Sequence, residues 1–270
     1  MGDAGRYEQA MSKINDIEPS PSESNRTRID DHPMLAGLSL ILGGAITFFY
    51  FAAFSEFNNT GLPWKLTGSL TLVSSALVLV QFATNRSERR LIWEGFAALC
   101  LLVGLWLFTG SCWLFYFSFA PIPAWLRWNV IVPGVVGTAH WLRMVWKDYK
   151  RDVQNLNLVE RLYKFEDDRI VYPGQSSDLL VGELTRRNPF TKLHLWAVPL
   201  GPLFGAIALG FAGHFRTSGG PHLIFLIASF FTFPMSQFLL GYGGAKTLYF
   251  HIYLPLKMER LTGKRVILAP

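Results

Sequence analysis

The first residues that could carry chemistry are ionisable side chains near the ends of long apolar stretches. His140 and Arg143 are three residues apart, so in a helix they share one face and could bind a lipid phosphate or a carboxylate. With Asp148 and His194 they could serve an enzyme that modifies lipids at the membrane interface. The simpler interpretation is that His140, Arg143 and His194 are interfacial side chains that contact lipid headgroups or a partner protein.

Metal and cofactor chemistry has little support in the sequence. The six histidines are never clustered, which excludes the repeated histidine pairs of a membrane di-iron enzyme. Cys100 and Cys112 fall in one apolar stretch, about 18 Å apart along a helix, which is too far for a disulfide. Nucleotide-binding fingerprints and the glycine-flanked serine of hydrolases are also missing from the sequence. We therefore expect no metal and no cofactor, and no catalytic residue can be named.

Prolines and glycines interrupt two apolar stretches and suggest a different kind of site. Pro199, Gly201 and Pro202 lie in one stretch, and Pro234 and Gly241 lie in the other. Proline frees backbone carbonyls within a membrane helix, and many transporters bind their substrates at such broken helices. On this interpretation the five residues line a substrate site.

Close helix packing is the alternative explanation for these small residues. Gly201 and Gly205 are four residues apart, as are Ser39, Gly43 and Thr47 in the first apolar stretch. Small side chains at this spacing give a helix a flat face on which a neighbouring helix can approach closely. Both interpretations stay open at this stage.

The elements that must position these residues are apolar helices. Half of the 270 residues are hydrophobic and 16% are charged, well below the charged fraction of an ordinary soluble domain. Six apolar stretches of 18 to 26 residues are long enough as helices to cross a hydrocarbon core of about 30 Å. They are Met34–Phe54, Leu66–Ala83, Trp93–Ser118, Trp128–Trp146, Leu193–Gly213 and Leu223–Ala245. The sequence thus predicts an all-α, polytopic membrane protein with a bundle of six transmembrane helices.

The positions of lysine and arginine predict the orientation of this bundle. Nearly all of them lie in the N-terminal tail, the loops at 84–92 and 147–192, and the tail after Ala245. The alternate connections hold one each, at Lys65, Arg127 and Arg216. Basic residues resist translocation, so both termini are predicted to be cytoplasmic. The net charge of +6 is then a topology signal that also attracts anionic lipid, and no nucleic-acid partner is expected.

The regions outside the apolar stretches divide the chain further. Residues 1–33 are polar and are predicted to form a disordered cytoplasmic tail, followed by four transmembrane helices over 34–146. Residues 147–192 form a basic cytoplasmic loop in which an amphipathic helix continues from the fourth stretch. Two further transmembrane helices occupy 193–245, and the cytoplasmic tail 246–270 has aromatic and basic residues that predict contact with lipid.

Three functions are compatible with this pattern. The first is a non-enzymatic subunit or accessory factor of an inner-membrane assembly for secretion, conjugation or defence, with a membrane protein partner or a second copy of the chain. The second is a small transporter or channel that uses the broken fifth and sixth helices, and the third is the interfacial lipid-modifying enzyme. The lack of organelle signals favours a bacterial inner membrane.

Overall fold

The computed structural model describes residues 31–55, 57, 61–155, 158–173 and 220–269. This part of the chain is mostly helical, and four of its helices are long and apolar enough to span a membrane. Three are consecutive: α2 (His32–Ser55), α3 (Leu62–Asn85) and α4 (Leu91–Thr109). The fourth is a long helix, Phe225–Thr262, which contains an apolar window of 18 residues. The prediction of a multi-pass membrane protein is therefore supported.

Small residues hold α2, α3 and α4 together. A side chain on Gly43 of α2 would collide with Thr71 of α3, and one on Gly104 of α4 would collide with Ser39 of α2. Because these positions lack bulky side chains, the helices approach each other closely. This is the packing that the spacing of Ser39, Gly43 and Thr47 predicts.

The third apolar stretch is not one continuous helix, contrary to the prediction for Trp93–Ser118. Helix α4 ends at Thr109, and after Gly110 and Ser111 a short helix α5 (Cys112–Phe119) begins. Ser111 is completely buried, and its hydroxyl donates to the Leu107 carbonyl and bonds the Tyr50 hydroxyl at 2.8 Å. The side chain of Ser111 thus satisfies backbone and side-chain groups where the helix is interrupted.

Two helices are longer than a membrane is thick. Helix α6 (Ala124–Asn155) has 32 residues and contains the predicted fourth stretch, but it is not among the four helices apolar enough to count as a span. The second long helix comprises α10 (Gly220–Phe238), the π-helices η2 (Leu239–Ala245) and η3 (Leu248–Tyr253), and α11 (Leu254–Thr262). The 38 residues from Phe225 to Thr262 span about 57 Å, nearly twice the hydrocarbon core, although only an 18-residue window of them is apolar enough to cross it. Both helices are therefore longer than the hydrocarbon core of a membrane.

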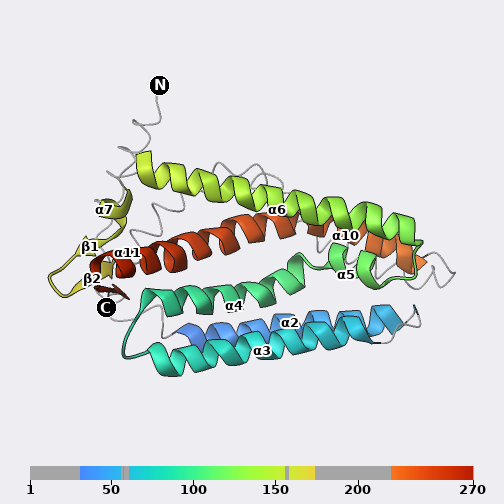
Figure 1. Ribbon diagram of the computed structural model, residues 1–270. Coiled ribbons are helices and arrows are strands. Elements are labelled where there is room, and N and C mark those ends of the chain that lie inside the picture. The colour runs from blue at the N-terminus through green and yellow to red at the C-terminus, as the bar shows by residue number, and fades with distance from the viewer. Residues whose placement is uncertain (1–30, 56, 58–60, 156–157, 174–219, 270) are drawn as a thin grey trace, which may run out of the picture.

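The residues after Ala245, which are predicted to form a tail in contact with lipid, are largely folded against the rest of the protein. The helix continues past Ala245, and Tyr249, Phe250 and Leu254 are buried inside the protein. Figure 1 shows this helix lying between α6 on one side and α4 on the other. Tyr249 and Phe250 therefore pack against protein, whereas Tyr253 remains 43% exposed. The predicted fifth stretch, 193–213, lies outside the described residues.

A small sheet departs from the all-α prediction. Its strands are β1 (Lys164–Phe165), β2 (Arg169–Tyr172) and β3 (Arg265–Leu268), in the order β1-β2-β3. The β1–β2 pair is antiparallel, whereas β2 and β3 are parallel and come from distant parts of the sequence. Gly263, with φ of 70°, ends α11 and turns the chain into β3.

The sheet, α7 (Leu158–Leu162), α11 and the turn between α3 and α4 gather at one end of the bundle (Figure 1). We call residues 86–90, 158–172 and 254–268 the cap. Tyr163, Ile170, Tyr172, Phe250 and Val266 are at most 1% exposed in the core that joins the cap to the long helices. The cap is consequently a packed unit in which segments from three parts of the chain meet.

Candidate functional site

The structure describes some of the residues that the sequence singled out, and it places three of them on α6. His140 and Arg143 are exposed on the outer face of α6. Asp148, which the enzyme hypothesis places beside them, lies 3.1 Å from Arg151 in an ion pair. His194, Pro199, Gly201 and Pro202 lie outside the described residues, whereas Pro234 lies within α10 and Gly241 within η2.

Around Pro234 and Gly241 the helices are joined by a line of hydrogen bonds. Gln237 is 2% exposed, and its Nε2 donates to the Thr138 hydroxyl of α6 at 2.8 Å. The Thr138 hydroxyl donates in turn to the Gly134 carbonyl, and Trp141 Nε1 donates to the Gln237 carbonyl at 3.3 Å. These bonds give buried polar groups partners where water is scarce.

The same region contacts α4. Trp106 Nε1 donates to the hydroxyl of Ser236 at 2.7 Å, and Ser236 is completely buried. Trp106, Thr138, Trp141, Ser236 and Gln237 together form what we call the polar seam. The seam lies where α10 changes into the π-helix η2 and where α4 is interrupted.

The glycines around the seam allow close approach between helices. A Cβ atom on Gly110 would lie 2.9 Å from Ser236 Cα, and one on Gly241 would lie 2.9 Å from Trp141 Nε1. A Cβ atom on Gly243 would lie 2.8 Å from a methyl carbon of Leu102. Side chains and backbone of neighbouring helices thus fill the positions next to these glycines. This favours the packing interpretation of Gly241 over its assignment to a substrate site.

A buried histidine–carboxylate contact joins the first turns of α2 and α4. His32 Nε2 lies 2.8 Å from a carboxylate oxygen of Glu94, and both side chains are 4% exposed. A Cβ atom on Gly95 would lie 2.9 Å from His251 Cβ, so the long helix passes at the same level. His251 Nε2 in turn lies 3.4 Å from the Tyr172 hydroxyl. Within the described ranges these groups do not form a cluster of three or more metal ligands.

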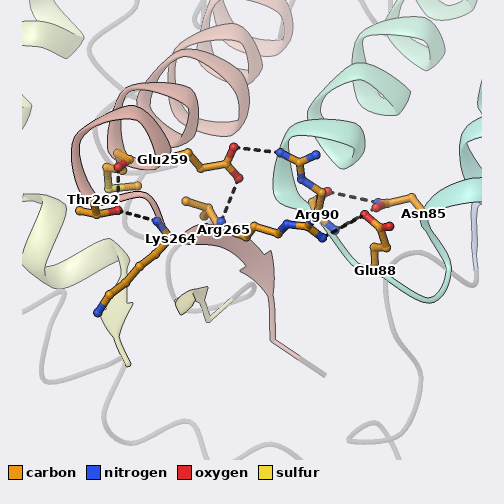
Figure 2. A network of polar contacts seen from close by, with 9 residues as sticks. Asn85, Glu88, Arg90, Glu259, Thr262, Lys264 and Arg265 are labelled. Carbon is orange, nitrogen blue, oxygen red and sulfur yellow. Dashed lines mark hydrogen bonds and ion pairs between the residues drawn. The ribbon is translucent and has the colours of Figure 1, made fainter. Parts of the chain in front are cut away.

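A further polar network lies in the cap (Figure 2). Glu259 of α11 accepts a hydrogen bond from the Arg90 guanidinium at 2.9 Å through one oxygen. Its other oxygen accepts from the Val266 backbone N–H of β3 at 3.0 Å. Asn85 bonds both the N–H and the carbonyl of Arg90, which holds the α3–α4 turn in place. Glu259 thus connects this turn, α11 and β3.

Backbone contacts extend this connection. The Leu268 N–H donates to the Arg89 carbonyl at 2.8 Å, and Arg90 forms a β-bridge with Ile267. Arg265 lies 3.8 Å from Glu88 (Figure 2). Strand β3 is therefore held between β2 on one side and the α3–α4 turn on the other. Arg89 has a φ of 49°, an uncommon backbone conformation for an arginine, at this turn.

A buried tyrosine fixes the remaining side of the cap to the long helix. The Tyr163 hydroxyl donates to the Phe250 carbonyl at 2.8 Å and is 1% exposed. Burial raises the pKa of Tyr163 far above that of a free tyrosine, because the low-polarity surroundings disfavour the phenolate. The phenol is therefore a neutral donor at physiological pH, which is the form that this hydrogen bond requires.

Most of these functional contacts have no obvious sequence signal. Ser236, Gln237 and Thr138 are uncharged, and a search for ionisable residues in apolar stretches does not identify them. Pro234 and Gly241, two to five residues from Ser236 and Gln237, do mark the region. The cap network depends on pairs as distant as Arg90 and Glu259, which only the folded chain brings together.

Comparisons with known proteins add no assignment to this geometry. No protein-family model, no curated protein and no solved structure matches the chain.

Proposed function

We propose that the protein is a non-enzymatic subunit or accessory factor of an inner-membrane assembly, such as one for secretion, conjugation or defence, and that the cap binds its partner. The observation that carries this proposal is the construction of the cap. Three distant segments form one folded unit at a single end of the bundle, held by the Arg90–Glu259 pair and by the pairing of β3 on both edges. A unit held this firmly can present a fixed surface to another protein.

The charge distribution supports a cytoplasmic position for the cap. Exposed basic residues such as Lys147, Arg161 and Lys164 lie in the cap or near it, whereas the connections at the opposite end carry Lys65 and Arg127. The more basic side of a multi-pass protein usually faces the cytoplasm. The first turns of α2 and α4, which meet at His32 and Glu94, lie at the cap end of the bundle (Figure 1). We propose that both termini are cytoplasmic.

A small transporter or channel is the second candidate. The interruption of α4 at Gly110 lies against Ser236, and the π-helix η2 begins three residues later. Two irregular helices that meet inside a membrane are a recurring arrangement in transport proteins, and π-helical turns are frequent at functional sites. The filled space beside Gly110 and Gly241 places this candidate second.

In-cell crosslinking distinguishes the two candidates. Phe165 of β1 is 52% exposed in the cap, and Trp125 at the other end of the molecule is 67% exposed. With a photoreactive amino acid at Phe165, we expect one discrete crosslinked partner in cells. The same residue at Trp125 is expected to give no such adduct.

A charge-reversed variant tests whether this adduct depends on the cap surface. Arg161→Glu with Lys164→Glu changes two exposed residues and is expected to abolish the adduct without lowering expression. A matched reversal at Lys65 serves as the control. No adduct from Phe165, or an adduct that survives the reversal, would contradict the subunit proposal, and substrate flux would then be measured.

A further inference from the structure

We infer that the surface where α6 meets the long C-terminal helix at the membrane boundary binds the phosphate of an anionic phospholipid. We call this surface the lipid seam; it is distinct from the polar seam. This inference does not depend on whether the protein has a protein partner. It rests on an aromatic cluster, on the level of that cluster relative to the membrane, and on two lysines placed next to it.

The aromatic cluster consists of Trp146, Tyr249 and Tyr253. The ring centroid of Trp146 lies 4.8 Å from that of Tyr249 and 5.2 Å from that of Tyr253, and the two tyrosine rings are 5.5 Å apart. Trp146 is half-buried and Tyr253 is 43% exposed, so the cluster reaches the surface at the lipid seam. Tryptophan and tyrosine prefer the boundary between hydrocarbon and headgroups.

Helix α4 shows that this cluster lies near the membrane boundary. With 19 residues α4 is about 28 Å long, close to the thickness of the hydrocarbon core, so its first turn marks one boundary. A Cβ atom on Gly95, directly after this first turn, would lie 2.9 Å from His251 Cβ and 2.7 Å from Ile252 Cγ1. Tyr253 follows directly, and the helix then passes out of the core toward the cap.

Two lysines lie one turn beyond the cluster on the cap side. Helix α6 and the long helix run in the same direction toward the cap (Figure 1). Lys150 follows Trp146 by four residues and Lys257 follows Tyr253 by four, so each lysine shares a helix face with an aromatic side chain of the cluster. Both are exposed, and neither forms an ion pair with the described residues.

The neighbouring acidic side chains are already engaged. Asp148 and Asp152 lie 3.1 and 3.7 Å from the Arg151 guanidinium. Arg143, three residues before Trp146, adds a further exposed cation on the membrane side of the cluster. The lipid seam therefore combines an aromatic surface that can contact the acyl chain with cations at the level of a lipid phosphate.

Quenching of Trp146 by brominated lipid tests this inference. Nanodiscs of phosphatidylcholine would contain a small, equal fraction of either brominated phosphatidylglycerol or brominated phosphatidylcholine. The Trp146 signal is the difference between the native protein and Trp146→Phe. We expect the anionic lipid to be enriched beside Trp146 on the order of tenfold over the zwitterionic lipid, because two exposed lysines attract its headgroup.

Two double variants show whether the enrichment of anionic lipid depends on the lysines of the lipid seam. Lys150→Gln with Lys257→Gln is expected to remove it, whereas Arg161→Gln with Lys164→Gln, which removes the same charge elsewhere in the cap, is expected to leave it unchanged. Equal quenching by both lipids in the native protein would overturn the inference, as would equal loss in both variants. Loss of the enrichment on addition of inorganic phosphate would assign the site to free phosphate and also overturn it.

Discussion

Replacing Gly110 with valine is expected to lower the free energy of unfolding by about 2 to 3 kcal/mol, because the added atoms have no space. A Cβ atom at this position would lie 2.9 Å from Ser236 Cα and 3.1 Å from Ser236 Cβ. Backbone atoms cannot move aside as a flexible side chain can, so α10 would have to separate from the interruption of α4. The backbone of Gly110, with φ of −122°, is accessible to any residue, which leaves steric collision as the cause.

The separation would also weaken the polar seam. Trp106 and Ser236 bond at 2.7 Å across this contact, and loss of such a bond in a buried position costs about 1 kcal/mol or more. Thermal unfolding in detergent micelles measures the effect. Gly137→Val on α6 is the matched control, since nothing lies within 4 Å of its Cβ position. Equal midpoints for the two variants would contradict the packing role of Gly110.

Glu259→Ala is expected to release β3 from the α3–α4 turn. The substitution removes both the partner of Arg90 and the acceptor of the Val266 N–H. The side chains of Arg90 and Glu259 are 27% and 15% exposed, so solvent screens the pair only in part. We expect the free energy of unfolding to fall by about 2 kcal/mol, because Arg90 and the Val266 N–H would be left without this partner in a partly buried place.

Hydrogen exchange of the Val266 and Leu268 amides reports this release directly. Both amides are expected to exchange on the order of tenfold faster or more in Glu259→Ala, as follows from such a loss of local stability. Glu259→Gln keeps an acceptor for Val266 and is expected to have an intermediate effect. Glu160→Ala removes an exposed carboxylate of α7 and is expected to change neither amide. Protection in Glu259→Ala equal to that in Glu160→Ala would show that Glu259 does not hold the cap together.

Apolar length predicts the four candidate membrane helices among the described residues, for a simple reason, whereas the fourth predicted stretch, in α6, is not among them. A run of about 20 apolar residues has few folds other than a membrane helix, so α2, α3, α4 and α10 all appear in the sequence. Length alone does not reveal an interruption, because Gly110 and Ser111 are as compatible with a membrane helix as with a break. For the same reason hydropathy does not distinguish the π-helix η2 from an α-helix.

The cap was beyond sequence reasoning because its contacts are tertiary. Its strands have two to four residues, too few for an alternating pattern to be recognised. Strand β3 pairs in parallel with β2, which requires that two distant segments first be brought together by the helices. The aromatic residues that follow Ala245 suggested an interface with lipid, and most of them instead face α6 and the cap core.

The polar seam shows a different limit. Attention to prolines and glycines singles out Pro234 and Gly241 in the sequence, but the role of these residues depends on what lies opposite them. Trp141 beside Gly241 and Ser236 beside Gly110 indicate packing, and no property of the glycines themselves distinguishes packing from substrate binding. Only the positions of the neighbouring helices distinguish packing from substrate binding.

Labelling of introduced cysteines from each side of the membrane tests the central claim, that the bundle crosses the membrane with the cap on the cytoplasmic side. Lys164→Cys places an exposed thiol in the cap, and Lys65→Cys places one at the opposite end of α3. The native protein, whose Cys112 is buried and Cys100 half-buried, sets the background. In sealed right-side-out membrane vesicles, an impermeant maleimide should label Lys65→Cys only, and the pattern should reverse in inside-out vesicles. Labelling of both positions from the same side would contradict this account.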